Sequence, residues 1–390
     1  MQQFCFQMRT RFVVGPGVLE QLGGIAKELG GTRVLVVSDP GIVQAGLFER
    51  GLHSLRAAGM QIASFHDFQE NPDSDQVERG VRVAKEFQPD LLVGLGGGSS
   101  MDCAKGINFV HSCGGRIHDY WGVGKATGAM LPLIAVPTTA GTGSESQSFA
   151  LISDAVTHAK MACGDPKAAA RVALLDPLLT LSQPPRVTAL TGIDALTHAI
   201  ESFVCRKRTP ISQLYAKEAW RYLRYGFPLV LEDPKSIEGR FCMQWGAALA
   251  GMAIEASMLG AAHALANPLT AHHDVAHGQA VGAMMPHVIA WNARQVASWY
   301  QELWNTVEPP LQVTRPLKPE SDAFAAAEKM ADWFGEMLQA GGLQQRLSAL
   351  SIPEKDLELL ASQAAQQWTA KYNPVEVHAD DLLQMYRRAL

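Results

Sequence analysis

The sequence lacks the basic clusters that mark nucleic-acid-binding proteins. Charged residues make up only 18% of its 390 residues, the formal net charge is −5, and no run of lysines and arginines occurs. A protein that follows a phosphate backbone needs such a run, so we expect no nucleic-acid partner. This composition favours small molecules as partners instead.

No apolar run in the sequence is uniform enough to span a membrane. The most hydrophobic region, residues 241–266, is interrupted by Gln244, Glu255 and His263. Its richness in alanine and glycine favours helices buried inside a protein. Residues 1–12 also lack the apolar core of a signal peptide. We therefore expect a cytoplasmic protein that makes no contact with a membrane.

The six cysteines show no CxxC spacing, which argues against zinc ribbons and thioredoxin-like redox motifs. Scattered free thiols are typical of proteins in a reducing compartment. The chain is 47% hydrophobic and exceeds the length that one ordinary core requires. Two domains are therefore expected.

Strand and helix patterns alternate in the first part of the chain. The predicted strands are residues 33–39, 61–68, 91–95 and 131–136, and the predicted helices are residues 47–58, 75–87 and 101–109. Short β-branched runs that alternate with helices predict a parallel sheet. After Asp176-Pro177 the strand pattern stops, and from Val187 onward helical periodicity dominates. We predict an N-terminal α/β domain with a Rossmann-like parallel sheet over residues 1–183, followed by an all-α domain over residues 184–390.

Two loops in the α/β part are suited to binding phosphate. Residues 96–100 (GGGSS) lie between a predicted strand and a predicted helix, an arrangement that directs backbone N–H groups at an anion. Residues 137–145 (PTTAGTGSE) follow another strand and are rich in hydroxyls. Each loop alone is also explained as an ordinary turn, but two of them fit a dinucleotide diphosphate better.

Asp39 ends the first predicted strand and favours NAD over NADP. A carboxylate there suits a ribose 2′-hydroxyl and would repel a 2′-phosphate. The alternative interpretation of Asp39 is a turn residue before Pro40.

Histidines are concentrated in residues 260–287, which hold five of the twelve together with one acidic residue and no lysine or arginine. Imidazoles among small apolar residues need a partner, and a divalent cation with a carboxylate ligand provides one. Upstream, Asp194 and His198 are four residues apart and share one face of a predicted helix. Such a pair alone is also explained as a hydrogen-bonded pair. Combined with His263 and His277, it predicts a metal site.

Four motifs, in order, resemble those of the iron-dependent (group III) alcohol dehydrogenase family. They are GGGSSMDCAKG (residues 96–106), PTTAGTGSE (137–145), GIDALTHAIESF (192–203) and AAHALANPLTAHHDVAHG (261–278). The resemblance covers essentially the whole chain. It implies the two-domain fold shared with dehydroquinate synthases, NAD as cofactor, a metal that is Fe²⁺ or in some members Zn²⁺, and a homodimer or larger homo-oligomer.

The resemblance also implies site residues. The implied metal ligands are Asp194, His198, His263 and His277. The residues that it places along the dinucleotide are Asp39, Asn71, Gly97, Gly98, Ser99, Thr138, Thr139, Thr142, Phe149, Lys160 and Leu179. The last three depend on their position after the second loop and not on a strict motif.

Two positions depart from the family pattern. Members commonly carry another histidine four residues after the third ligand, and this chain has Asn267 there. An amide orients an alcohol or a water but does not exchange a proton near neutral pH, so a proton relay needs His273 or His272. The catalytic candidates are therefore His273, His272 and Asn267. Residues 373–375 read NPV where relatives often read NPR, which removes a guanidinium.

The predicted activity is that of a metal-dependent, NAD-linked alcohol dehydrogenase, which interconverts an alcohol and its aldehyde or ketone by hydride transfer. Two alternatives on the same fold are a hydroxyacid-oxoacid transhydrogenase and a dehydroquinate synthase-like lyase. A third is a binding or scaffold protein without activity. The predicted substrate is a small molecule, either an alcohol or an aldehyde.

Overall fold

The computed structural model describes residues 3–306 and 319–390 of the chain. Within these residues the chain forms two compact units, an α/β unit of residues 7–182 and a helical unit of residues 183–390. Residues 3–6 belong to the helical unit, where the ring of Phe6 lies 6.1 Å from the ring of Tyr215. The predicted boundary assigns these residues to the α/β domain, because their sequence pattern does not show which side chain they contact.

The α/β unit is built on a parallel sheet whose six described strands lie in the order β1-β9-β6-β4-β2-β3. Their bounds are β1 (Arg11–Val14), β2 (Arg33–Val37), β3 (Gln61–Phe65), β4 (Leu91–Gly96), β6 (Leu133–Pro137) and β9 (Val172–Leu175). All residues of β4, β6 and β9 are buried. A parallel strand is covered on both faces by its crossover helices, which explains these continuous apolar runs.

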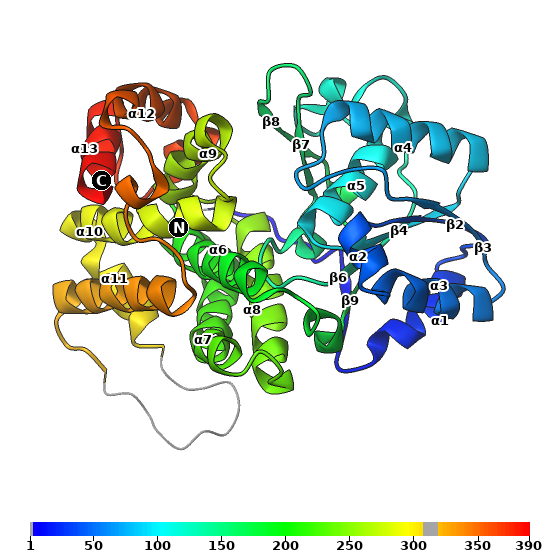
Figure 1. The fold of residues 1–390 in the computed structure, drawn as a ribbon, viewed down its shortest axis with the longest axis horizontal. Helices are drawn as coiled ribbons and strands as arrows, with labels where there is room; N and C mark the ends of the chain where they lie inside the picture. The colour runs from blue at the N-terminus through cyan, green and yellow to red at the C-terminus, as the bar shows by residue number, and fades with distance from the viewer. Residues whose placement is uncertain (1–2, 307–318) are drawn as a thin grey trace. The chain divides into compact units, whose positions relative to one another are not determined.

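Helices cover the two faces of this sheet (Figure 1). They are α1 (Leu22–Glu28), α2 (Pro40–Gln44), α3 (Leu47–Ala57), α4 (Ser74–Phe87) and α5 (Gly98–Cys113). One hydrophobic core joins α1 and α3 to the strands through residues such as Leu22, Leu55 and Val93. On the other face α5 packs against β4 and β6. The alternating arrangement confirms the predicted Rossmann-like α/β part.

Helix α4 shows how the sequence fixes a local boundary. The side chain of Asp73 accepts a hydrogen bond from the backbone N–H of Gln76, and the side chain of Gln76 accepts one from the backbone N–H of Asp73. This reciprocal pair is a capping box and satisfies two donors that the first helical turn leaves unpaired. The N-cap of α4 is therefore Asp73.

A second, smaller sheet of the α/β unit has no counterpart in the sequence prediction. It contains β5 (Gly122–Val123), β7 (Phe149–Ser153) and β8 (Lys160–Gly164) in the order β5-β8-β7, with β7 and β8 antiparallel. These strands are short; β7 and β8 are only partly buried, and neither residue of β5 is buried. Their hydrophobic pattern is therefore too weak to separate them from loops.

The second unit is helical throughout its described residues. Its α-helices are α6 (Pro185–Val204), α7 (Pro210–Glu232), α8 (Ile237–Glu255), α9 (Ala261–His273), α10 (His277–Trp304), α11 (Ala323–Ala340), α12 (Leu357–Gln366) and α13 (Ala379–Ala389). Helix α6 packs against α7, α8, α10 and α11, and is therefore enclosed by its neighbours (Figure 1). Residues 192–204 of α6 are all buried. This unit confirms the predicted all-α part.

Short 3-10 helices connect several elements. They are η1 (Val18–Gln21), η2 (Ile117–Tyr120), η3 (Ser144–Ser146), η4 (Pro166–Ala168), η5 (Pro177–Thr180), η6 (Ser348–Leu350), η7 (Glu354–Asp356) and η8 (Trp368–Tyr372). Among the helices of the described residues, none combines the length and the hydropathy that crossing a bilayer requires. The apolar region 241–266 forms parts of α8 and α9, as the sequence predicts for buried helices.

Candidate functional site

Helix α6 contributes the first two predicted metal ligands. Asp194 and His198 are one turn apart, and His198 Nε2 lies 3.3 Å from Asp194 Oδ1. Both side chains are buried. The four-residue spacing places them on the same helical face, as the sequence predicts.

Helices α9 and α10 bring the other two predicted ligands to the same carboxylate. His263 Nε2 is 3.5 Å and His277 Nε2 is 3.7 Å from Asp194 Oδ1. Asp194, His263 and His277 each offer a ligand atom, and these atoms all lie within 4.8 Å of one another. The ring of His198 is stacked on that of His263, with centroids 4.9 Å apart. The structure therefore brings all four predicted ligands together.

Two atoms of this cluster show that it fits a cation. Asp194 Oδ1 and His263 Nε2 are buried and have no hydrogen-bond partner. A buried polar atom left unpaired costs roughly 1–3 kcal/mol. A cation between them would satisfy the oxygen and the nitrogen at once, and a carboxylate with imidazoles is a suitable ligand set for Fe²⁺ or Zn²⁺.

The charges of the cluster support each other. Burial raises the pKa of the Asp194 carboxyl, but the imidazoles of His198, His263 and His277 together outweigh it and hold that pKa below its usual range. Burial lowers the pKa of His263, whereas the carboxylates of Glu201 and Asp194 raise it, to about 9. The cluster therefore favours positive charge beside Asp194, and a bound cation would replace a proton there.

Glu201 belongs to the site but was missed as a site residue. It lies on α6, three residues after His198, and its Oε2 is 2.6 Å from His263 Nδ1. A signal was present in the sequence, because Asp194, His198 and Glu201 have the spacing i, i+4, i+7 of one helical face. The sequence does not show, however, that this face meets His263.

Asn267 lies on α9 one turn after His263. Its Nδ2 donates to the side-chain oxygen of Gln367, at 3.0 Å. The amide that replaces the family histidine is therefore held by a second amide.

The two histidines proposed as proton relays lie at the C-terminal end of α9. His272 Nε2 is 2.6 Å from the side-chain oxygen of Gln363, and His273 Nε2 is 3.5 Å from Asp356 Oδ2. His272 is exposed and His273 is partly buried. Both are thus held by residues of α12 and η7.

In the α/β unit, the first glycine loop starts helix α5. Gly97 is the N-cap, and Gly98 and Ser99 already lie in the first turn, three residues earlier than the sequence predicts. Gly98 must lack a side chain, because a Cβ there would lie 2.6 Å from Cγ2 of Thr142. The two predicted phosphate loops therefore lie against each other at the N-terminus of a 16-residue helix, which favours an anion.

Other predicted dinucleotide residues lie beside this helix start. The backbone N–H of Asn71 donates to Ser99 Oγ at 3.1 Å, and Asn71 has a left-handed φ of 55°. A Cβ on Gly97 would lie 3.4 Å from Cγ2 of Thr139. Thr138 is buried, and its hydroxyl has no hydrogen-bond partner.

Asp39 caps helix α2 with its side chain. Its Oδ1 accepts from the backbone N–H of Ile42 at 3.2 Å, and its Oδ2 accepts from Ser100 Oγ at 2.9 Å. Before Pro40, Asp39 is therefore a helix N-cap and not simply a turn residue. The same contacts fix the carboxylate next to the first glycine loop.

The three residues predicted to contact the dinucleotide from their position alone lie in different environments. Phe149 begins β7, and its ring covers Gly164 so closely that a Cβ there would lie 2.3 Å from it. Lys160 is exposed at the start of β8. Leu179 is fully buried in the core beneath the sheet.

Lys105 and Asp102 hold the second loop in place. Lys105 is fully buried, and its Nζ donates to the backbone oxygens of Ser144, Gln147 and Phe149 and to Ser144 Oγ, at 2.7–2.9 Å. Asp102 accepts from Ser144 Oγ at 2.6 Å. The Asp and Lys of the first motif therefore shape the second motif.

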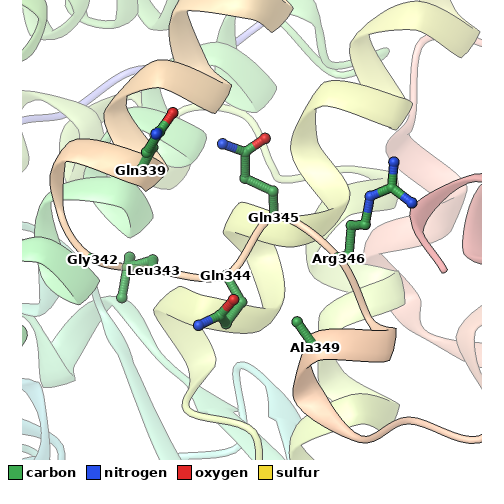
Figure 2. Close-up of a pocket in the computed structure, with 7 residues that line it drawn as sticks. All are labelled: Gln339, Gly342, Leu343, Gln344, Gln345, Arg346 and Ala349. Atoms are coloured by element: carbon green, nitrogen blue, oxygen red, sulfur yellow. The ribbon is translucent and has the colours of Figure 1, made fainter.

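A pocket of about 430 Å³ lies elsewhere in the helical unit, after α11 (Figure 2). It is lined by Gln339, Gly342, Leu343, Gln344, Gln345, Arg346 and Ala349. The Gln344 backbone exchanges two hydrogen bonds with the side chain of Gln279, which follows His277 by two residues. The pocket wall is thus tied to the first turn of α10, but none of the predicted site residues lines it.

Comparison with known proteins agrees with this geometry. Residues 9–177 match the family model described as iron-containing alcohol dehydrogenase. Residues 188–390 match the model for the C-terminal part of the Fe-containing alcohol dehydrogenase family. The chain belongs to the iron-containing alcohol dehydrogenase family. The resemblance, the enzyme class and the activity type that the sequence predicts are thereby confirmed, and the two alternatives, a hydroxyacid-oxoacid transhydrogenase and a dehydroquinate synthase-like lyase, are not favoured.

Relatives in this family match the chain over nearly its whole length. The NAD-dependent methanol dehydrogenase of Bacillus methanolicus is 32% identical over 97% of this chain and 97% of its own. A solved 1,3-propanediol oxidoreductase is 29% identical, covers 100% of both chains and has a TM-score of 0.93. A sulfoacetaldehyde reductase from Bifidobacterium kashiwanohense, solved with NAD⁺, is 26% identical over 100% of this chain and 99% of its own, with a TM-score of 0.86.

Proposed function

We propose that this member of the iron-containing family is an NAD-dependent dehydrogenase of a small alcohol, with Fe²⁺ as the metal and Zn²⁺ as a possible substitute. The observation that carries the proposal is the pair of buried, unpartnered atoms, Asp194 Oδ1 and His263 Nε2, with His198 and His277 beside them. The relatives named for methanol and 1,3-propanediol support a small alcohol as substrate. The absence of lysine and arginine from residues 260–287 disfavours a strongly anionic one.

The four side chains would hold the metal, which acts when bound as a Lewis acid that lowers the pKa of an alcohol hydroxyl. Asp194 supplies the negative charge that offsets the cation. Burial of Asp194, His198 and His263 excludes water and strengthens these interactions. The amide of Asn267, fixed by Gln367, is placed one helical turn from His263 to orient a hydroxyl or a water.

The α/β unit would bind NAD with its paired loops. The N-terminus of α5 and the hydroxyls of Thr138, Thr139 and Thr142 suit the diphosphate. Asp39, whose carboxylate is held by Ser100, suits the ribose 2′-hydroxyl. The relatives that use or bind NAD support this choice of cofactor. When bound there, NAD would supply the hydride acceptor for the reaction.

His273, or else His272, is the proposed proton relay. An imidazole side chain can accept and donate a proton in catalysis, which the amide of Asn267 cannot. Each histidine is replaced in turn with Asn, and the pH–rate profile should change in the variant that loses the relay. Equal, unchanged profiles for both variants would remove the histidines from the mechanism.

The decisive experiment combines metal and cofactor. The protein is stripped with a chelator, reloaded with Fe²⁺ or Zn²⁺, and assayed by NADH absorbance with a panel of alcohols and aldehydes against NAD and NADP. We expect net NADH formation from a simple alcohol only after reloading. Hydride exchange between a hydroxy acid and an oxo acid without net NADH would establish the transhydrogenase alternative instead.

We propose further that the enzyme acts in the cytoplasm as a homodimer or larger homo-oligomer. The cysteines of the described residues are all free, which agrees with a reducing compartment. Light scattering during size-exclusion chromatography gives the mass directly, and a monomer of 42.2 kDa would contradict the proposed assembly.

A further inference from the structure

Glu201 uses both carboxylate oxygens at the start of helix α9. Its Oε2 lies 2.6 Å from His263 Nδ1, and its Oε1 accepts from the backbone N–H of Ala262 at 2.7 Å. The side chain is 2% exposed, so water does not compete for these bonds. Glu201 thus binds both the ring of His263 and the backbone that carries it.

This arrangement fixes which nitrogen of His263 faces the metal centre. A carboxylate only accepts hydrogen bonds, so His263 Nδ1 carries the proton in the pair. The lone pair of Nε2 is then left for a cation, and Nε2 lies 3.5 Å from Asp194 Oδ1. A carboxylate behind a ligating histidine orients the ring and raises its basicity as a ligand.

The backbone around Gly260 is built for this close approach. A Cβ at Gly260 would lie 3.1 Å from Glu201 Oε1 and 3.1 Å from Asn373 Oδ1. Either contact is tight, so glycine is the residue that admits both side chains.

Asn373 anchors the same helix start through its hydrogen bonds. Its Oδ1 accepts from the backbone N–H of Ala261 at 3.3 Å, and its amide exchanges hydrogen bonds with Asn292. Its Nδ2 also donates to the backbone oxygen of Val375 at 2.7 Å. The change from NPR to NPV leaves this network intact, because only the backbone of residue 375 takes part. Asn373 therefore provides a matched control for Glu201.

We propose that Glu201 is a positioning residue for the metal centre, which fixes the tautomer and the ring orientation of His263. The inference rests on the proposed metal site and adds to it a residue outside the four ligands. Substitution of such a carboxylate typically lowers metal affinity about 10–100-fold.

The test compares Glu201→Gln with Asn373→Ala. Chelator-stripped proteins are titrated with Co²⁺ in competition with a chromogenic chelator, and the visible spectrum of bound Co²⁺ is recorded. We expect Glu201→Gln to bind Co²⁺ at least about tenfold more weakly, with an altered spectrum. Asn373→Ala should keep the wild-type spectrum and an affinity within about threefold, since the hydrogen bonds of Asn373 go to the backbone of Ala261 and Val375 and to Asn292. Wild-type affinity in Glu201→Gln, or equal losses in both variants, would overturn the inference.

A measurement on the unmodified chain keeps the inference testable if Glu201→Gln does not fold. In protein loaded with Zn²⁺ and labelled at histidine, the Nδ1 proton of His263 should give a slowly exchanging, strongly downfield NMR signal. The signal is assigned by its loss in His263→Gln. Absence of the signal, or ligation through Nδ1, contradicts the role of Glu201. Failure of the wild-type protein to bind any of these metals would instead contradict the proposed function.

Discussion

Buried polar groups are paired differently in two regions of the molecule: the metal centre of the helical unit, and the residues Lys105 and Asp102 that support the glycine loops of the α/β unit. Beside the loops, Lys105 of α5 donates hydrogen bonds to four acceptors, and Asp102 accepts one from Ser144 Oγ. In the metal centre, Asp194 Oδ1 and His263 Nε2 are buried without a partner. Lys105 and Asp102 thus find their partners within the protein, whereas the metal centre is completed only by a ligand.

This difference separates two kinds of substitution. A change at the metal centre should cost function and leave the fold largely intact, because the protein already tolerates unpaired atoms there. A change at Lys105 or Asp102 should cost stability, because each removes a partner from groups that are buried with it.

The largest effect on function is expected for His263→Ala and His277→Ala. Each removes one of the nitrogens near Asp194 Oδ1, and the Lewis-acid contribution is several kcal/mol. Turnover of the reloaded enzyme should fall about a thousandfold. NAD affinity, measured by quenching of protein fluorescence, should stay near the wild-type value. Near wild-type turnover in either variant would refute the metal assignment.

The largest effect on stability is expected for Lys105→Met. The substitution leaves three backbone oxygens and the Asp102 carboxylate without their cation, and breaking a buried charged network costs about 3–5 kcal/mol. Chemical denaturation measures the loss. Lys85→Met on the exposed face of α4 is the control and should cost less than about 0.5 kcal/mol. Equal losses would show that the network does not stabilise the loops.

Glu145 should make stability depend on pH. Burial raises the pKa of its carboxyl to about 7, so the folded state holds a proton that the unfolded state releases near its ordinary pKa of 4.5. The stabilisation is complete below about pH 4.5 and is lost as the pH rises through about 7. Relative to the wild type, Glu145→Gln should therefore gain up to roughly 3 kcal/mol above pH 7. Melting temperatures of both proteins across this range give the difference, and a constant difference would contradict it.

The smallest expected effect concerns cofactor choice. In Asp39→Asn the amide oxygen still caps helix α2, but the charge that repels a 2′-phosphate is gone. The ratio of kcat/KM for NADP to that for NAD should rise about tenfold, a change of roughly 1.4 kcal/mol. Asp73→Asn, a cap of the same kind on α4, is the control and should leave the ratio unchanged. An unchanged ratio in Asp39→Asn would remove Asp39 from cofactor selection.

The sequence predicts the main elements well where a pattern is strong. Strand β4, with every residue buried, and helix α4, with its Asp73 cap, lie within a residue or two of the predicted ranges. The pattern fails for β7 and β8, which are only partly buried, and for β5, in which neither residue is buried. It also places the start of α5 too late, because Gly98, Ser99 and Ser100, which belong to the predicted loop, already lie in the first helical turn.

The candidate site divides in the same way. Spacing on one helix is enough to pair Asp194 with His198, and the family motifs supply His263 and His277. Spacing does not show that Glu201 meets His263, because the partner lies 62 residues away on another helix. Nor does it show that His272 and His273 contact α12 and η7.

By itself, the sequence determined the chemistry of this protein, because residue types and local periodicity fix which ligands are present and which helical face carries them. The tertiary structure alone decided how those groups are paired. Hydrogen bonds such as Glu201 to His263 and Lys105 to the loop of Ser144 join segments far apart in the chain, and their directions depend on how the helices pack. Packing, not local pattern, therefore distinguishes the buried atoms that the protein satisfies from those left for a ligand.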